Sequence, residues 1–207
     1  MGKVSFSGLS LATRPGRVMT PRPASEQLVA AALERVGAHP ARVVDVGTGV
    51  GAIAVAIADA APNAYVFATD TSRCAVALAR ANVCRHGLGD RVTVCQGDLL
   101  DPVPGRIDLV VANLPYLPAA DAGRYPDLAA EPAAAVFAPG DGLEPYRRLL
   151  ASCVERLDDD AAVVIQLHRN VIEAPRPELP ALLARLEHLK WAPEYVPQLA
   201  ADRKSVV

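Results

Sequence analysis

A four-residue motif suited to chemistry on a nitrogen atom stands at Asn113-Leu114-Pro115-Tyr116, directly after a short apolar run. An amide or aromatic amino nitrogen is a poor nucleophile because its lone pair is delocalised. The Asn113 side-chain oxygen and the backbone carbonyl of Leu114 or Pro115 can accept both N–H groups of such a nitrogen, while Tyr116 stacks on the planar group. This acceptor motif predicts activation of a planar nitrogen by orientation and electrostatics, although a plain strand-exit turn has similar residue types.

A glycine-rich segment, Asp45-Val46-Gly47-Thr48-Gly49-Val50-Gly51, joins an apolar run to a stretch of helical character. Glycines between a strand and a helix let the backbone approach a ligand closely, so this glycine loop predicts a cofactor site rather than a bare turn. Two classes of cofactor fit. Gly47-x-Gly49-x-x-Ala52 satisfies the pattern of nicotinamide and flavin enzymes, and the same glycines suit S-adenosylmethionine.

Carboxylates at the ends of three expected strands bear on that choice. Asp45 precedes the first glycine, where it would repel the pyrophosphate of a dinucleotide and attract the ammonium and sulfonium groups of S-adenosylmethionine. Asp70 fits both cofactors, because its two oxygens can accept bonds from both ribose hydroxyls. Asp98 stands where it can accept from an adenine amino group, or where a solvated turn residue would stand. We therefore expect S-adenosylmethionine as the cofactor and S-adenosylhomocysteine as its product.

The elements that must position these residues alternate between strands and helices. Alternation predicts a parallel sheet with helices on both faces, and continuous apolar strands are expected when both faces are covered. Ligands bind such sheets at the carboxyl ends of the strands, near the point where the strand order reverses. The glycine loop, Asp70, Asp98 and Asn113 all follow expected strands, so we expect one site at this edge.

The individual elements follow from periodicity and from turn residues. The expected strands are Val43–Val46, Ala64–Thr69, Arg91–Cys95, Ile107–Ala112 and Ala161–Leu167. The expected helices are 24–37 with Ser25 as its N-cap, Val50–Ala61, Ser72–His86, Glu144–Leu157 and 181–190. Trp191–Val196 and Ser205–Val207 are expected to add an antiparallel pair at the edge. Together they predict an α/β fold, a three-layer α/β/α sandwich around a mostly parallel seven-stranded sheet with an antiparallel C-terminal edge.

Length and composition restrict the other possibilities. The 207 residues suffice for one domain with a full core, and the net charge of −2 gives no sign of the basic surface that duplex binding requires. No apolar run is long enough to span a membrane and no signal-peptide core is present, so we expect a cytoplasmic protein that binds no membrane. Four scattered cysteines predict reduced thiols and no metal site. We expect an N-terminal arm over residues 1–23 and one methyltransferase domain over residues 24–207.

These motifs resemble those of the HemK-type protein-glutamine N5-methyltransferases, which modify peptide-chain release factors and have the class I, Rossmann-like methyltransferase fold. The resemblance runs from about Val18 to at least Arg148. Its motifs are Met19-Thr20-Pro21-Arg22-Pro23, Glu26, the glycine loop, Ala68-Thr69-Asp70, Gln96-Gly97-Asp98-Leu99, the acceptor motif, Glu131-Pro132, Gly140-Asp141-Gly142-Leu143 and Tyr146-Arg147-Arg148. The motifs from Glu131 onward are more specific to the family than the glycine loop, which many methyltransferases share.

The resemblance implies a donor site and an acceptor site. The residues implied to contact the cofactor are Asp45, Gly47, Thr48, Gly49, Gly51, Asp70, Thr71, Asp98, Leu99 and Asn113. The implied catalytic residues are Asn113, Pro115 and Tyr116, and those implied to bind substrate are Pro21, Arg22, Leu114 and Tyr116. Glu26 is expected near the acceptor pocket, although the Pro21-Arg22-Pro23 segment also suits a helix entry that packs on the sheet. Tyr125, in a Pro- and Gly-rich stretch, is a candidate lid residue.

Several positions depart from the family pattern. Bacterial members begin with a helical domain that holds the release factor, and we expect that domain to be missing here. Leu114 stands where proline is usual, and Asp158-Asp159-Asp160 replaces a Pro-Gly-Gly turn, which we interpret as solvated loop charge. The fifth strand ends in Gln166-Leu167-His168-Arg169, where the family tends to have an acidic residue and a glycine. These departures leave more than one class of substrate open.

Four functions stay open on the sequence alone. The first is methylation of the Gly-Gly-Gln loop of a release factor, reached through another surface or a partner subunit. The second is methylation of a small-molecule amide or amine of secondary metabolism. The third, a nucleic-acid N-methyltransferase, lacks a basic surface and a target-recognition domain. The fourth is a binding module that holds the cofactor without turnover.

Overall fold

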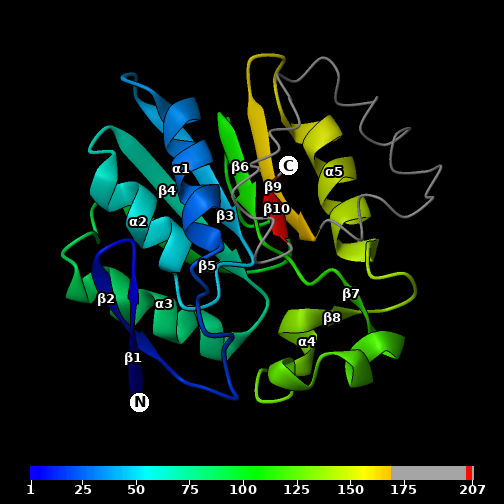
Figure 1. Ribbon diagram of the computed structural model, residues 1–207. Helices are drawn as coiled ribbons and strands as arrows, with labels where there is room; N and C mark the ends of the chain where they lie inside the picture. Colours follow the sequence, from blue (N-terminus) through cyan, green and yellow to red (C-terminus); the bar gives the residue numbers. More distant parts are fainter. Residues whose placement is uncertain (169–203, 207) are drawn as a thin grey trace.

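The computed structural model describes residues 1–168 and 204–206, and its central sheet lies between two groups of helices (Figure 1). The strand order is β10-β9-β6-β3-β4-β5. These strands are β3 (Ala41–Val46), β4 (Ala64–Asp70), β5 (Val92–Gln96), β6 (Leu109–Ala112), β9 (Ala162–His168) and β10 (Lys204–Val206). Strands β3, β4, β5, β6 and β9 are parallel, and β10 pairs antiparallel with β9. The α/β class and the antiparallel edge are confirmed, whereas the expected strand 191–196 and helix 181–190 lie outside the described residues.

Helices cover both faces of the sheet, which explains its apolar strands. The helices are α1 (Ser25–Val36), α2 (Ala52–Ala60), α3 (Arg73–Arg85) and α5 (Glu144–Arg156). Val43 belongs to the buried cluster that contains residues of α1, α2 and α3, whereas Val44 belongs to the cluster of α5. Successive side chains of a strand point to opposite faces of the sheet, so the residues on both faces must be apolar. Within the described residues, no helix has the length and apolar character needed to cross a bilayer.

The strand order reverses between β3 and β6. The chain passes from β3 through β4 to β5 at one edge and then returns to β6 on the other side of β3. Strands β3 and β6 are in register, with Val46 opposite Ala112. The residues that follow these two strands are Gly47 and Asn113, so the glycine loop and the acceptor motif start side by side, as expected at such a switch point.

Short elements fill the stretch between β6 and α5. They are β7 (Leu117–Pro118), η1 (Ala119–Arg124), η2 (Pro126–Leu128), α4 (Ala133–Val136) and β8 (Phe137–Ala138). Strands β7 and β8 form a small parallel pair of their own. Figure 1 shows this group below the carboxyl end of β6, to the right of the view. It therefore forms one wall beside the acceptor motif.

The N-terminal arm contains a β-hairpin that the sequence analysis did not predict. Strands β1 (Gly2–Phe6) and β2 (Leu9–Thr13) pair antiparallel around a turn at Ser7 and Gly8, both of which have positive φ. Phe6 and Leu11 are buried in the same cluster as α1, α2 and α3. The arm is therefore packed against the sheet's helical layer, and the division of the chain at residue 23 stays a prediction.

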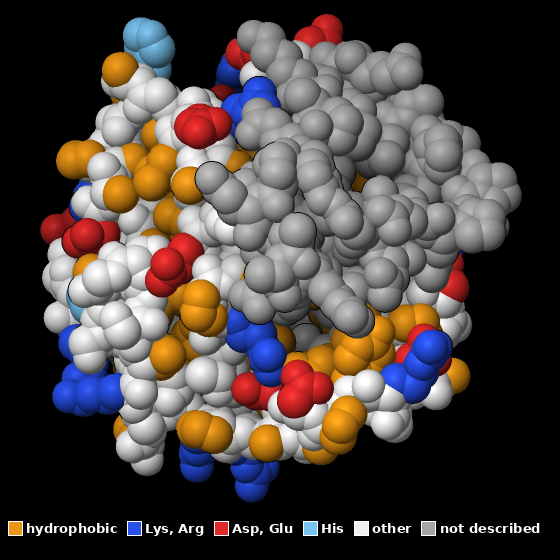
Figure 2. Space-filling view, viewed as in Figure 1, with side chains coloured by type: hydrophobic (Ala, Val, Ile, Leu, Met, Phe, Trp, Pro, Cys, Tyr) orange, Lys and Arg blue, Asp and Glu red, His pale blue; other side chains and the backbone are white. Residues whose placement is uncertain are grey.

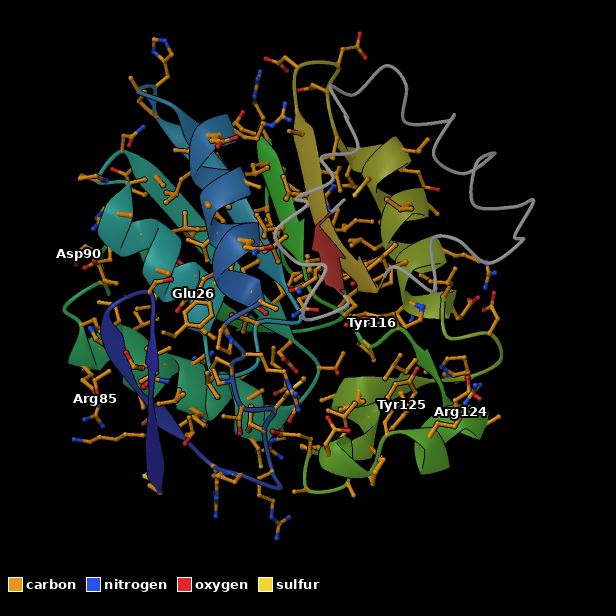
Figure 3. The ribbon with its side chains drawn as sticks, viewed as in Figure 1. Glu26, Arg85, Asp90, Tyr116, Arg124 and Tyr125 are labelled. Atoms are coloured by element: carbon orange, nitrogen blue, oxygen red, sulfur yellow. The ribbon has the colours of Figure 1, made fainter. Side chains whose placement is uncertain are left out.

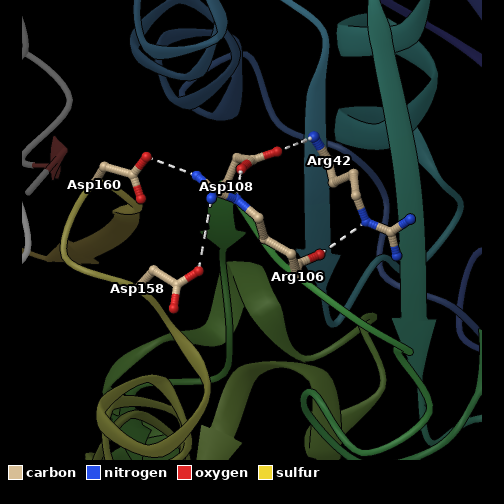
Figure 4. A network of polar contacts seen from close by, with 5 residues as sticks. All are labelled: Arg42, Arg106, Asp108, Asp158 and Asp160. Atoms are coloured by element: carbon tan, nitrogen blue, oxygen red, sulfur yellow. Dashed lines mark hydrogen bonds and ion pairs between the residues drawn. The ribbon is translucent and has the colours of Figure 1, made fainter.

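A polar network joins the amino ends of β3, β6 and β9, far along the strands from the glycine loop (Figure 4). Arg106 lies 2.7 Å from Asp108 and 2.6 Å from Asp160, with Asp158 at 3.8 Å. The Arg42 backbone N–H donates to Asp108 at 2.8 Å. Asp158 and Asp160 are exposed, as expected for solvated loop charge, but they also pair with Arg106.

Candidate active site

A cavity of about 410 Å³ lies at the carboxyl ends of β3 and β6. Its lining comes from parts of 19–25, 47–53, 113–117 and 125–136, together with Phe6 of the hairpin. The predicted residues in this lining are Pro21, Arg22, Gly47, Thr48, Gly49, Asn113, Leu114, Pro115 and Tyr116. The fold thus brings together the N-terminal segment, the glycine loop and the acceptor motif around one cavity.

The other predicted residues lie outside this lining, and they are Asp45, Gly51, Asp70, Thr71, Asp98 and Leu99. Asp70 ends β4 and pairs in register with Gln96 of β5, just before Asp98. One Asp70 oxygen accepts from the backbone N–H of Gly49 at 2.9 Å. The carboxyl ends of β4 and β5 therefore lie beside the glycine loop, on the side of β3 that is opposite to β6 and the acceptor motif.

Asp45 does not face the mouth of the cavity, which corrects the expectation from the sequence. Its side chain is fully buried beneath the glycine loop. Its Oδ2 atom accepts from the Thr48 hydroxyl at 2.6 Å and from the Ala54 backbone N–H at 3.1 Å, whereas Oδ1 is buried with no hydrogen-bond partner. Burial raises the pKa of Asp45 to about 7, against the effect of these two bonds. Asp45 therefore ties the loop to the start of α2.

Asp70 is positioned to accept further hydrogen bonds. Its Oδ1 accepts from the Ser72 backbone N–H at 2.8 Å and its Oδ2 from Gly49. Burial raises the pKa of Asp70, and these two bonds oppose the shift. Each carboxylate oxygen has about two acceptor sites, so both retain capacity for a ribose hydroxyl.

Asp98 has a partner that sequence reasoning did not find. Its Oδ2 atom pairs with the Arg148 guanidinium of α5, and both side chains are partly exposed. The next residue, Leu99, has a positive φ of 44°, and its carbonyl accepts from the buried Thr69 hydroxyl at 2.9 Å. Arg148 thus connects the Asp98-Leu99 turn to α5. The ion pair uses Asp98 Oδ2, so Oδ1 is the oxygen that can accept from an adenine amino group.

The family-specific stretch from Gly140 to Arg148, which we call the support segment, lies under the acceptor motif. The Tyr146 hydroxyl accepts from the Leu114 backbone N–H at 3.0 Å and donates to the Gln166 carbonyl at 2.7 Å. A Cβ atom on Gly142 would lie 2.4 Å from the Tyr116 carbonyl oxygen, so only glycine allows this approach. The support segment therefore fixes the backbone on which the acceptor motif stands.

The glycine loop and the acceptor motif also touch each other directly. Gly47 has a φ of 71°, and a Cβ atom there would lie 2.7 Å from Leu114 Cδ2. The Leu114 side chain is 8% exposed and closes the gap between the two motifs. A leucine at the position where proline is usual therefore fits this cavity.

Asn113 and Ser25 meet at the edge of the cavity. Asn113 Nδ2 donates to Ser25 Oγ at 3.0 Å, and Ser25 Oγ donates to Gln166 Oε1 at 3.1 Å. Ser25 is the first residue of α1, whose N-cap is Ala24 without a side-chain cap bond. The expectation that Ser25 caps α1 was wrong, because its hydroxyl points to Asn113 and Gln166 instead.

Two tyrosines and an arginine form the acceptor end of the cavity. Tyr116 and Tyr125 both line the cavity, and Figure 3 shows Tyr125 below Tyr116, among the short elements that follow β6. Burial raises the pKa of Tyr116 to about 12, and the positive charge of Arg22 offsets part of the rise. The Arg22 Nε atom is buried and makes no hydrogen bond within the described residues. Tyr116 is therefore a neutral phenol at neutral pH, and the Nε donor of Arg22 is available to a ligand.

Glu26 was expected near the acceptor pocket, and it is not among the residues that line the cavity. Its carboxylate accepts from the Ser7 backbone N–H at 2.7 Å and so holds the hairpin turn (Figure 3). Glu131 has the complementary role on the other side, because it accepts from the Thr20 backbone N–H at 3.1 Å. These two acids anchor the N-terminal segment beside the cavity.

Several lining residues were missed by sequence reasoning, namely Phe6, Met19, Asp127, Leu128, Ala135 and Val136. Met19 begins the Met19–Pro23 motif but was assigned no role, and its place in that motif is a signal that could have placed it. The segment 125–136 is rich in alanine and proline and has no period, so only the lid candidate Tyr125 and the Glu131-Pro132 motif mark it in the sequence.

Comparison with known proteins places the chain in a family. Residues 23–124 match the family model of the methyltransferase small domain. A release factor glutamine methyltransferase of Deinococcus radiodurans is 38% identical over 99% of this chain and 71% of its own length. A ribosomal protein uL3 glutamine methyltransferase of Bradyrhizobium diazoefficiens is 39% identical over 70% of this chain and 47% of its own length. The chain spans 47% to 71% of the length of the curated relatives considered.

Solved structures agree on the fold. The hMettl16 catalytic domain superimposes with a TM-score of 0.69 over 86% of this chain and 66% of that chain, at 20% identity. This likeness shows the class I methyltransferase fold. The curated relatives show more, since one aligns along nearly the whole of this chain. The chain therefore belongs to the family of the release factor glutamine methyltransferases, whose methyl donor is S-adenosylmethionine.

Proposed function

We propose that this chain transfers a methyl group from S-adenosylmethionine to the side-chain nitrogen of a glutamine in a protein. The observation that carries the proposal is the single cavity that the glycine loop and the acceptor motif share, with Asn113 at its edge. The names of two groups of relatives support a protein glutamine as the acceptor, because one group is named for release factors and the other for ribosomal protein uL3.

The donor side is built from the glycine loop and the ends of β4 and β5. Asp70 accepts bonds from the ribose hydroxyls, and Asp98 with Leu99 borders the adenine. Gly47 and Gly49 let the backbone approach the amino-acid part, above the buried Asp45 oxygen that has no partner. When bound, S-adenosylmethionine would supply an electrophilic methyl carbon on a sulfonium sulfur: the N–C bond would form as the S–C bond breaks, S-adenosylhomocysteine would be the leaving group, and the nitrogen would lose a proton to water. Thr48, Gly51 and Thr71 complete the proposed donor side.

The acceptor side orients a carboxamide. Asn113 Oδ1 and the Leu114 or Pro115 carbonyl accept the two N–H groups, which favours a more tetrahedral nitrogen with its lone pair directed at the methyl carbon. Tyr116 covers the planar amide as a neutral phenol, since its pKa of about 12 excludes a role as base at neutral pH. Pro21 and Arg22 line the same end, where Arg22 can hydrogen-bond a backbone carbonyl of the substrate.

The substrate that we propose is the Gly-Gly-Gln loop of a release factor, with a partner subunit as a further possibility for docking. Figure 2 shows Lys and Arg side chains interspersed with Asp and Glu on the described part of one face, without a field of one sign. Duplex nucleic acid is bound through basic surfaces, so the described part of this face does not favour a duplex as the acceptor. Localisation in the cytoplasm, where release factors act, is part of the same proposal.

A methyl-transfer assay that offers three acceptors side by side tests the proposal. The acceptors are a release factor, a Gly-Gly-Gln peptide and a cell metabolite extract, and label from the cofactor's methyl group is followed in each. We expect label in the release factor, and none in a release factor whose acceptor glutamine is replaced by alanine. Label in the metabolite extract alone would replace the proposal with a small-molecule methyltransferase. No label in any acceptor, from a chain that binds S-adenosylhomocysteine, would favour a binding module.

A further inference from the structure

Three polar side chains from distant parts of the chain form a series of hydrogen bonds that runs from the edge of the cavity into the buried interior. They are Asn113 after β6, Ser25 at the start of α1 and Gln166 in β9. Ser25 is 6% exposed and Gln166 is 1% exposed. Resting on the proposed function, we propose that Ser25 and Gln166 are positioning residues that hold the Asn113 carboxamide with its oxygen toward the acceptor.

The direction of the bonds decides which end of Asn113 faces the cavity. Asn113 Nδ2 donates to Ser25 Oγ, which in turn donates to Gln166 Oε1. A carboxamide has one acceptor oxygen and one donor nitrogen. With the nitrogen bound to Ser25, Asn113 Oδ1 is left to accept an N–H of the substrate. The reverse direction would place donor against donor, and the substrate amide would lose this contact.

Gln166 Oε1 is the acceptor at the end of the series, because the Ser25 hydroxyl donates to it at 3.1 Å. Its Nε2 atom is buried and has no hydrogen-bond partner in the described part of the chain. Its backbone is held in place, since the Gln166 carbonyl accepts from the Tyr146 hydroxyl at 2.7 Å. A hydroxyl has one proton, so Ser25, which donates to Gln166, can only accept from Asn113. The same tyrosine hydroxyl accepts from the Leu114 backbone N–H, so Tyr146 contacts both Gln166 and the acceptor motif.

Steady-state kinetics with substitutions at Ser25 tests the proposal. Ser25→Ala should lower kcat for a protein glutamine about 10- to 100-fold, because an unheld carboxamide samples the wrong orientation. The KM for the acceptor and the affinity for S-adenosylhomocysteine should change less than about threefold, since the glycine loop does not depend on Ser25. Ser25→Thr, which keeps the hydroxyl, should restore kcat.

Asn63→Ala is the matched control for lost stability. The Asn63 amide donates to the Gly37 and His39 carbonyls at the amino end of β4, away from the cavity. This variant should lose stability and keep kcat. At the other end of the series, Gln166→Glu keeps an acceptor and should keep kcat, whereas Gln166→Met should lower it as Ser25→Ala does. Equal kcat for Ser25→Ala and the wild-type chain would overturn the proposal.

Proton exchange at the Asn113 side chain gives a second readout that needs no acceptor. The two amide proton signals are assigned by their loss in Asn113→Asp. We expect one of them to exchange slowly with solvent in the wild-type chain and quickly in Ser25→Ala. Fast exchange of both protons in the wild-type chain would contradict the bond to Ser25. Failure of the wild-type chain to methylate any glutamine would instead contradict the proposed function and leave this readout decisive for the positioning role.

Discussion

Asp45 has no exposed surface, and burial raises its pKa to about 7 from an ordinary 3.8. A carboxyl group whose pKa is higher in the folded than in the unfolded state binds more protons in the folded state between those values. The free energy of unfolding contributed by Asp45 therefore falls as the pH rises from about 4 to about 7, and the full cost is present above that range. At a pH above about 7, the ionised Asp45 carboxylate therefore destabilises the fold at the start of the glycine loop.

Asp45→Asn should remove this cost, because an amide oxygen can still accept from Thr48 and from the Ala54 N–H. We expect the variant to exceed the wild-type chain in free energy of unfolding at pH 8 by up to about 4 kcal/mol, and to lie much closer to it at pH 5. Urea denaturation of the ligand-free chains at the two pH values measures the difference. A difference that stays the same at both values would show that Asp45 does not titrate in this range.

Residue types at the ends of strands were readable from the sequence, and their partners were not. Gly47, Asp70 and Asn113 could be placed at the carboxyl ends of strands, because each expected role calls for a particular residue type there, and the roles themselves stay predictions. Ser25 was mistaken for a helix cap, because its bond to Gln166 spans 141 positions of the chain. Local patterns carry no information on contacts of that length.

The support segment contains the family motif Gly140-Asp141-Gly142-Leu143, and its structure gives that motif a physical role. Asp141 and Arg147 form a two-pronged ion pair at 2.9 and 2.6 Å, which fixes the turn before α5. Gly142 in that turn has a φ of 88° and lies against the backbone of Tyr116 and Pro118. The turn therefore packs directly against the backbone at the end of the acceptor motif.

Gly142→Ala should therefore affect both stability and turnover. The left-handed backbone alone costs a non-glycine residue about 1 to 2 kcal/mol, and the new Cβ atom must also push the Tyr116 carbonyl away. We expect a lower melting temperature and at least a tenfold lower kcat/KM for the acceptor. Gly89→Ala is the control, because a Cβ atom there meets nothing within 4 Å. Unchanged kcat/KM in Gly142→Ala would show that the acceptor motif does not rest on this turn.

At the scale of the whole molecule, Asn82 connects the hairpin to the cofactor site. From α3, its amide oxygen accepts from the Ala12 N–H at 2.8 Å, and its nitrogen donates to the carbonyls of Ala12 and Val50 at 3.0 and 2.8 Å. Asn82 is fully buried. The Asn82 side chain thus bonds both backbone groups of Ala12 in β2, as an adjacent strand would, and it also bonds the glycine loop at Val50.

Asn82→Ala should leave three buried backbone groups without partners. We expect the free energy of unfolding to fall by about 3 kcal/mol, together with weaker binding of S-adenosylhomocysteine, because Val50 belongs to the glycine loop. Chemical denaturation and calorimetric titration measure the two effects. A loss of stability with unchanged affinity would mean that the hairpin and the cofactor site are independent.

The layered fold was predictable because it follows from patterns repeated along the chain. Apolar strands such as Val43–Val46, each ended by a polar residue or a glycine, indicate a doubly covered parallel sheet with its site at one edge. The hairpin at Gly2–Thr13 was missed because its strands are short and their buried residues pack on a helix that is distant in sequence. Alternation alone does not reveal such long-range packing.

The location of the transferred methyl group tests the account most directly. A release factor is incubated with S-adenosylmethionine and either the wild-type chain or Asn113→Ala, and tandem mass spectrometry of its peptides locates new methyl groups. We predict one methyl group on the glutamine of the Gly-Gly-Gln loop with the wild-type chain, and at least a hundredfold slower modification with Asn113→Ala. Methylation at another residue, or equal rates for the two chains, would contradict the proposed acceptor site.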